Sequence, residues 1–300
     1  MPTFYNESAK NVAKTWVYLA FFSLFLITVG WVISWGTGDI GILYISVIIA
    51  VGTSFYTYWN SHKMVLKMSN AQPLDTKKYP EIDNIVENLA ISEGLPKPDI
   101  YFIDENQPNA FATGRNPEHG VVAVTRGLIE RLDRSELEAV IAHELSHIKN
   151  RDILVSTIAV VLAGAIAIIS RVFLRSMIFG RRGNSEGKGN AVGLIIAVVV
   201  AIVAPLFAMM LRFAVSRKRE YLADSTAVLM TRYPDALASA LEKISSHPEE
   251  LKAANEATAN LYIANPLRGD SNKGIINKLF MTHPPVEERI KTIRNIDVKE

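Results

Sequence analysis

The chain has 300 residues, of which 49% are hydrophobic and 21% are charged, and its formal net charge is +2. A chain of this length folds as one large domain or two small ones, and so small a net charge argues against nucleic acid as a partner. Cysteine is absent. Disulfide bonds and cysteine-ligated zinc are therefore excluded, and a bound metal must have histidine and carboxylate ligands.

Four apolar runs are each close to the ~20 residues that cross a bilayer as a helix. They are residues 16–35, 40–58, 153–170 and 191–215. All four tryptophans lie at the ends of the first two runs, where the aromatic belt of a membrane helix is expected; they are Trp16, Trp31, Trp35 and Trp59. The sequence therefore predicts a multi-pass membrane protein with about four transmembrane helices and a lipid bilayer as its environment.

The lysines around the first two runs predict which side of the membrane the polar segments face. Lys10 and Lys14 precede the first run, Lys63 and Lys67 follow the second, and the turn at residues 36–39 has no lysine or arginine. Cytoplasmic segments next to a membrane carry an excess of lysine and arginine. We therefore expect the N-terminus and the segment after the second run to be cytoplasmic.

The connection between the third and fourth runs conflicts with this rule. Residues 171–190 are rich in arginine, and two full crossings would place them on the far side. A re-entrant pair of helices is the alternative. The expected parts are an N-terminal transmembrane hairpin (1–60), a cytoplasmic catalytic part (61–152), a second transmembrane hairpin (153–215) and a C-terminal catalytic part (216–300).

The segment after the first hairpin has the patterns of a soluble α+β domain. Helical periodicity covers residues 79–95, and short strands are predicted at 100–104, 109–113 and 121–125. The turn-rich residues 114–120 indicate that the last two strands form a hairpin.

A helix over residues 135–150 carries the residues with the clearest chemistry. Ser135 followed by Glu138 is typical of a capping box at its start. His143 and His147 are four apart, so both imidazoles lie on one face and can bind one metal ion. Glu144 is offset by one position, beside the expected place of a metal-activated water, and is the candidate general base.

A catalytic zinc site needs a third protein ligand. Asn150 and Ile153 stand where the longer HExxHxxGxxH pattern has its glycine and third histidine, so the ligand must come from elsewhere. Glu220 and Asp224 are four apart on a predicted helix. We expect Glu220 to bind the metal and Asp224 to orient a ligand histidine; a solvated acidic pair beside the preceding basic residues is the alternative.

Several motifs in order make the chain resemble a known family. HELSH at 143–147 is followed by NRD, SRKREYLAD and THPPVEERI, with PNAFATG earlier at 108–114. Together they resemble the HtpX family of membrane metalloproteases, related to the CAAX prenyl proteases. The resemblance implies a gluzincin: one Zn²⁺ per chain held by His143, His147 and Glu220, with Glu144 as base.

What the resemblance implies for the whole chain is a mainly α integral membrane protein with a cytoplasmic α+β gluzincin domain carrying a small β-sheet. It also implies a zinc endopeptidase of a prokaryotic cell membrane. Its substrates would be misfolded or damaged membrane proteins, cut at the cytoplasmic side in quality control and the stress response.

Two further sets of residues are candidates for contacts with the substrate. The first is a strand that can pair with an extended peptide if it lies at a sheet edge; a plain structural strand is the alternative. Its residues are Asn109, Ala110, Phe111 and Ala112. The second is His283, a candidate donor to the oxyanion, with Tyr221 as its competitor and helix capping as its structural alternative.

Two other classes of function compete with the protease. One is a non-catalytic scaffold that uses zinc to join its cytoplasmic parts, but a structural zinc needs no base such as Glu144. The other is a transporter, which would place ionisable groups inside its spans. Arg212, close to an end, is the ionisable residue that these runs offer.

Overall fold

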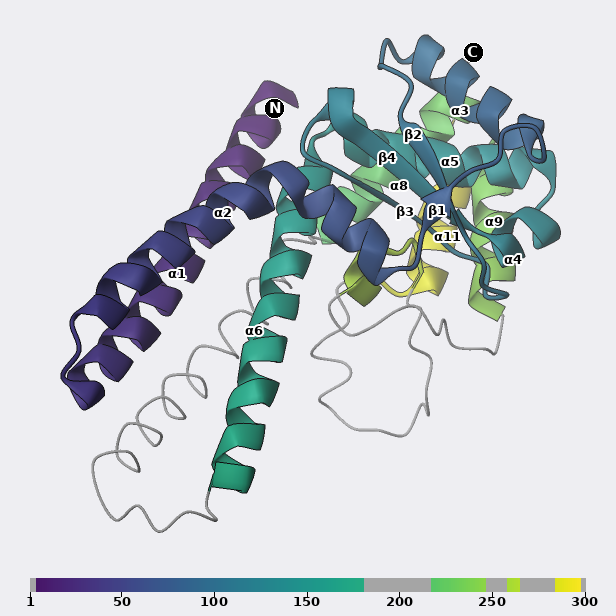
Figure 1. Ribbon diagram of the computed structural model, residues 1–300. Coiled ribbons are helices and arrows are strands. Elements are labelled where there is room, and N and C mark those ends of the chain that lie inside the picture. The colour runs from purple at the N-terminus through teal and green to yellow at the C-terminus, as the bar shows by residue number, and fades with distance from the viewer. Residues whose placement is uncertain (1–3, 181–216, 247–257, 265–283, 298–300) are drawn as a thin grey trace.

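The computed structural model describes residues 4–180, 217–246, 258–264 and 284–297. It is mainly helical with one small mixed sheet, and Figure 1 shows a long helical hairpin beside a compact α/β part. The described helices are α1 (Phe4–Thr37), α2 (Gly41–Met68), α3 (Pro80–Ser92), α4 (Arg126–Arg131), α5 (Arg134–Lys149), α6 (Asp152–Gly180), α8 (Arg217–Thr231), α9 (Pro234–Ser246) and α11 (Val286–Arg294), with 3-10 turns at Pro117–His119 and Thr258–Leu261.

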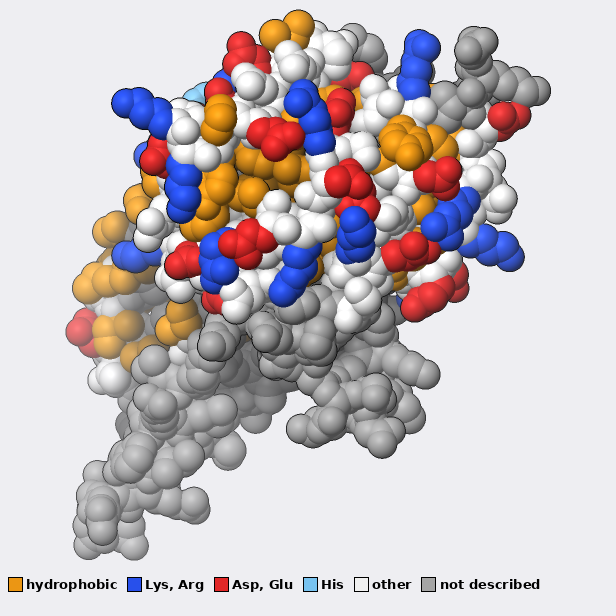
Figure 2. Space-filling view, turned by 90° about the vertical axis from the view of Figure 1, so that its right-hand side faces the viewer, with side chains coloured by type: hydrophobic (Ala, Val, Ile, Leu, Met, Phe, Trp, Pro, Cys, Tyr) orange, Lys and Arg blue, Asp and Glu red, His pale blue; other side chains and the backbone are white. Residues whose placement is uncertain are grey.

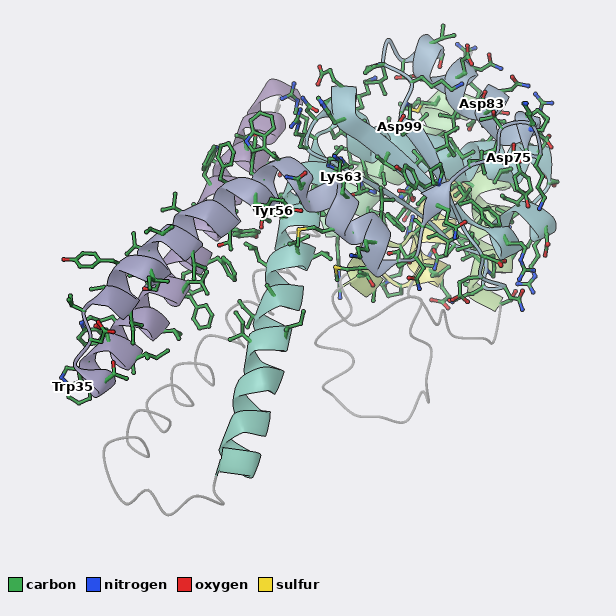
Figure 3. All side chains as sticks on the ribbon, viewed as in Figure 1. Trp35, Tyr56, Lys63, Asp75, Asp83 and Asp99 are labelled. Atoms are coloured by element: carbon green, nitrogen blue, oxygen red, sulfur yellow. The ribbon has the colours of Figure 1, made fainter. Side chains whose placement is uncertain are left out.

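The hairpin of α1 and α2 contains the first two apolar runs. Lys10–Thr37 and Gly41–Met68 are long and apolar enough to cross a membrane, by length and composition. Trp35 lies at the tip of the hairpin in Figure 3, whereas Lys63 lies where α2 meets the compact part. The two predicted apolar helices are therefore present, with apolar side chains exposed along most of their length.

The third apolar run lies in α6, which packs against both α1 and α2. The apolar stretch within it, Asp152–Ile166, is shorter than the two helices of the hairpin. Residues 191–215, the fourth run, lie outside the described residues. The expected number of about four membrane spans therefore remains a prediction.

The sheet has the strand order β1-β2-β4-β3. Its strands are β1 (Gln72–Pro73), β2 (Asp99–Ile103), β3 (Ala110–Gly114) and β4 (Gly120–Thr125). β3 pairs antiparallel with β4, which confirms the predicted hairpin, and β2 pairs parallel with β4. The short strand β1 was not predicted, because two residues are too few to show alternation.

Both faces of β3 and β4 are buried, and alternate side chains enter two different hydrophobic cores. Ala110 and Ala112 face a core built with α3, α5, α8 and α9, whereas Phe111 faces one built with α1, α2 and α6. The hairpin of α1 and α2 therefore packs against the same sheet as the helix that carries the histidines. Figure 2 shows intermixed acidic and basic side chains on a different face of the compact part, as expected of a surface in water.

The N-terminus of α5 differs from the prediction. Asp133, two residues before Ser135, is the N-cap: its carboxylate accepts from the backbone N–H of Glu136, and the Glu136 side chain accepts from the backbone N–H of Asp133. The predicted Ser135–Glu138 box is therefore wrong. Asp is as good a cap as Ser, and the pattern occurs twice here in shifted register.

Candidate active site

Helices α5 and α8 pack together and place the predicted residues in one cluster. His143, Glu144 and His147 come from α5, and Glu220 and Asp224 come from α8. The spacing of four puts each pair on the face that meets the other helix. His143, Glu144, Glu220 and Asp224 are almost completely buried, as expected of polar groups that serve one another or a ligand.

The three expected ligands are arranged as a metal ion requires. One ligand atom each of His143, His147 and Glu220 lies within 4.8 Å of the others. The two Nε2 atoms are 3.3 Å apart, and the Glu220 oxygens lie 3.8 and 3.7 Å from Nε2 of His143 and His147. Tetrahedral zinc with such ligands separates them by roughly 3.3–3.6 Å. Two imidazoles and a carboxylate therefore fit zinc in both chemistry and spacing.

The other ring nitrogen of each histidine faces a carboxylate. His143 Nδ1 lies 3.0 Å from Asp224 Oδ1, and His147 Nδ1 lies 3.3 Å from Asp152 Oδ2. Such carboxylates fix the ring orientation and tautomer of a ligand histidine. The sequence reasoning expected this of Asp224 but missed it for Asp152. The available signal was its position in the NRD motif, where Arg151 turns the chain with φ of 56° between α5 and α6.

Glu144 lies beside the expected ligands, and one of its carboxylate oxygens has no hydrogen bond within the described residues. This oxygen is Oε2, which is buried. Burial raises its pKa to about 7, and the nearby Glu220 charge acts in the same direction. A carboxyl with a pKa near neutrality can accept a proton and return it.

Neighbouring charges and hydrogen bonds shift the pKa values of His147 and Asp224. Burial alone would lower the pKa of His147, but its hydrogen bond with Asp152 and the charge of Glu220 raise it to about 9. Burial alone would raise the pKa of Asp224, but the Arg289 charge and hydrogen bonds lower it to about 2. The site therefore favours positive charge at His147, which a divalent cation can supply in place of a proton, whereas burial lowers the pKa of His143 and keeps its ring neutral.

The predicted substrate strand lies next to this cluster, at the edge of the sheet. Ala112 lines the cavity and its backbone hydrogen-bonds to Glu144. The edge is partly filled by the chain itself: the Ile263 N–H donates to the Ala110 carbonyl at 3.0 Å, and the Asn109 side-chain amide donates to the Ala264 carbonyl at 2.9 Å.

The same segment narrows the cavity at the cluster. Leu261 and Ile263 line it together with the three expected ligands and Glu144. Its volume is about 30 Å³, which accommodates one or two water molecules and no peptide. The Tyr262 ring packs edge-on against Phe111, with ring centroids 5.0 Å apart. Residues 261–263 therefore occupy space beside β3 that an extended substrate would need.

The two candidate oxyanion donors have different outcomes. His283 lies outside the described residues. The Tyr221 hydroxyl donates to Glu288 Oε2 at 3.2 Å. In this conformation Tyr221 is engaged away from the cavity, which its side chain does not line.

Comparison with known proteins gives consistent matches over most of the chain. Residues 76–297 match the profile of peptidase family M48. A "Protease HtpX homolog" of Dictyoglomus turgidum is 45% identical over 294 residues, covering 97% of this chain and 94% of the relative. One of Thermoanaerobacter pseudethanolicus is 43% identical over 302 residues, covering 98% of each. A crystal structure of S. mikatae Ste24p aligns with a TM-score of 0.49 and 16% identity, covering 94% of this chain and 67% of that one.

Proposed function

Because the chain belongs to peptidase family M48 and is an HtpX-type metalloprotease, we propose that it is a membrane-bound zinc endopeptidase with Glu144 as its general base. His143, His147 and Glu220 are the zinc ligands, and Asp224 orients His143. The buried, unpartnered Oε2 of Glu144 beside these ligands carries the proposal, because a purely structural metal site needs no such group.

The chemistry follows from what each side chain can do at this position. Zinc held by His143, His147 and Glu220 would act as a Lewis acid, polarising a peptide carbonyl and lowering the pKa of water. Glu144 takes the proton of the attacking water and passes it to the leaving amine, for which its pKa near 7 is suited. Asp224 and Asp152 hold the two imidazoles in place. His283 is our candidate donor to the oxyanion.

The substrate is an extended peptide that pairs with the edge of β3, along Asn109, Ala110, Phe111 and Ala112. Support comes from the position of β3 at the sheet edge and from Ile263, which already hydrogen-bonds to Ala110 there. A peptide must displace Ile263 to reach this carbonyl. Backbone pairing depends little on side chains, which suits a protease of misfolded or damaged membrane proteins in stress.

For the topology we propose that residues 1–60 and 153–215 cross the membrane, with about four spans in all. Residues 61–152 and 216–300 then form the catalytic domain on the cytoplasmic side of a prokaryotic cell membrane. The two long apolar helices and the lysines at the base of the hairpin support this arrangement. Protein substrates are therefore reached at the membrane surface.

The test compares the wild type with Glu144→Gln, both full-length, purified in detergent under chelation and then supplied with zinc. Gel analysis of unfolded casein measures cleavage, and metal analysis measures bound zinc. We expect both proteins to bind one zinc and the wild type alone to cleave. Stoichiometric zinc without cleavage by either protein would favour a zinc-joined scaffold, and cleavage by Glu144→Gln would contradict the assigned base.

A further inference from the structure

A buried asparagine of the membrane hairpin reaches the metal centre. Asn11 lies near the start of α1 and is 2% exposed. Its side-chain Nδ2 donates to Oδ1 of Asp152 at 2.9 Å, although the two residues are 141 positions apart. A buried amide is costly unless its polar atoms are paired. This one is paired with a residue of the active-site cavity, which Asp152 lines.

Both oxygens of Asp152 are engaged, and each faces a different part of the molecule. Oδ2 faces Nδ1 of the ligand His147 at 3.3 Å, while Oδ1 accepts from Asn11. Arg219 completes the arrangement from α8: its Nη1 donates to Asn11 Oδ1 at 3.0 Å and lies 3.5 Å from Asp152 Oδ1. The amide of Asn11 is therefore used as donor and acceptor at once.

The orientation of the Asp152 side chain depends on these contacts. It stands at the first turn of α6, directly after the left-handed Arg151. Its side chain is 7% exposed, so water cannot easily replace a lost partner. An imidazole ligand keeps its orientation only if the carboxylate behind it is itself held.

We propose that Asn11 is a positioning residue of the metal centre, which fixes Asp152 and through it His147. The first membrane helix is then a structural component of the metal site as well as an anchor, and metal affinity depends on how α1 packs against α6. This inference rests on the proposed function, since it takes His147 to be a metal ligand. The side chain of Asn11 is not among those that line the cavity at the cluster.

The experiment measures zinc affinity rather than cleavage. Full-length wild type, Asn11→Ala and Asn11→Asp are purified in the same detergent, and zinc dissociation constants are obtained by competition with a chelator. Removing a carboxylate that directly supports a ligand typically weakens metal binding 10- to 100-fold. Asn11 acts one contact further from the metal, so we expect zinc affinity to fall on the order of fivefold in both variants. Asn11→Asp keeps the side-chain size and the acceptor for Arg219 but replaces the donor to Asp152 with a carboxylate oxygen that repels it, so it removes this contact without removing the packing.

Thr15→Val is the matched control. Thr15 is buried one turn along α1, and its hydroxyl donates to the Asn11 carbonyl of the same helix. We expect its zinc affinity to match the wild type. The absorption spectrum of bound Co²⁺ is a second readout, because a reoriented His147 changes the ligand field. We expect it to change in the Asn11 variants and to stay unchanged in Thr15→Val.

A double-mutant cycle with Asp152→Ala identifies the route of the effect. If Asn11 acts through Asp152, Asn11→Ala adds no further loss of zinc affinity in the Asp152→Ala background. Unchanged affinity in both Asn11 variants, an equal loss in Thr15→Val, or additive losses in the cycle would each overturn the inference. A wild type that binds no zinc would instead overturn the proposed function, and this inference with it.

Discussion

The guanidinium of Arg289 meets the carboxylate of Asp224 through two hydrogen bonds, Nε to Oδ2 at 2.9 Å and Nη2 to Oδ1 at 2.7 Å, with both side chains buried. Asp224 in turn faces His143, and Nη1 of Arg289 donates to the Ile263 carbonyl at 2.8 Å. One arginine therefore joins α11 to the carboxylate behind His143, the proposed ligand, and to the segment that fills the edge of β3.

Arg289→Ala should strongly destabilise the protein. It leaves the Asp224 carboxylate buried without its cation, and breaking a buried ion pair in this way costs about 3–5 kcal/mol. Thermal unfolding of the detergent-solubilised protein measures the loss. Arg294→Ala, on the same helix but with its side chain 47% exposed, should cost about 1 kcal/mol or less. Equal effects of the two variants would contradict a special role for the buried pair.

Glu220→Ala should remove a direct metal ligand. We expect zinc affinity to fall by more than the roughly 10- to 100-fold that is typical of losing an outer contact. Chelator competition measures this, and Glu287→Ala, which removes an exposed carboxylate from α11, serves as the control. Unchanged affinity in Glu220→Ala would mean that another group is the third ligand.

The raised pKa of Glu144 predicts how the stability of the metal-free protein depends on pH. In the folded state this pKa is about 7, against a usual value of 4.5, so folding favours the protonated form. The resulting stability is fully present below about pH 4.5 and is lost as pH rises through 7. The difference corresponds to roughly 3 kcal/mol.

Glu144→Gln cannot ionise at this position and should escape that loss. Under chelation, the unfolding temperature of the wild type relative to Glu144→Gln should therefore fall between pH 5 and pH 8. The two proteins are compared at each pH, so the contributions of the other titrating groups, which both proteins share, cancel to first order in the difference. A constant difference between the two proteins across this range would argue against the raised pKa.

Ile263→Pro should make the substrate edge of β3 easier to reach. Proline has no backbone N–H, so the hydrogen bond to the Ala110 carbonyl is lost. A bond of about 1 kcal/mol corresponds to a roughly fivefold rise in kcat/KM for an unstructured peptide, if the segment competes with the substrate. Zinc affinity should not change. Ile263→Val, which keeps the N–H, should behave as the wild type, and a lower kcat/KM in Ile263→Pro would show that the segment contributes to the productive site.

Asp133→Ala should destabilise α5 at its N-terminus by about 1 kcal/mol, the usual effect of removing an N-cap. Ser135→Ala should have a smaller effect, because the Ser135 hydroxyl donates to the Asp133 carboxylate and caps no backbone N–H of α5. Thermal unfolding of the two variants distinguishes them. A larger loss of stability in Ser135→Ala than in Asp133→Ala would instead favour Ser135 as the N-cap.

Much of the local structure could be predicted because its signals are short in range. Helical spacing of four brought His143 and His147 onto one face, and the same spacing paired Glu220 with Asp224. The alternation of strands around a turn-rich segment predicted the β3–β4 hairpin. The prediction chose Ser135 over Asp133 as the N-cap and was wrong, because both residues satisfy the same local pattern and differ only in where the helix begins.

The sequence by itself determined which residues are candidates for the chemistry: the motif on α5 and the acidic pair on α8 follow from residue types at helical spacing, and the apolar runs of the hairpin follow from hydropathy. The tertiary structure alone decided which partners they meet. Asn11 and Asp152 are 141 positions apart, Asp224 and Arg289 are 65 apart, and Asn109 and Ala264 are 155 apart. Periodicity places a side chain on a face of its own helix or strand, whereas packing between elements determines which faces come together. The contact of Asp152 with His147, the filling of the β3 edge by Ile263 and the contact of Asn11 with Asp152 therefore became visible only in the folded chain.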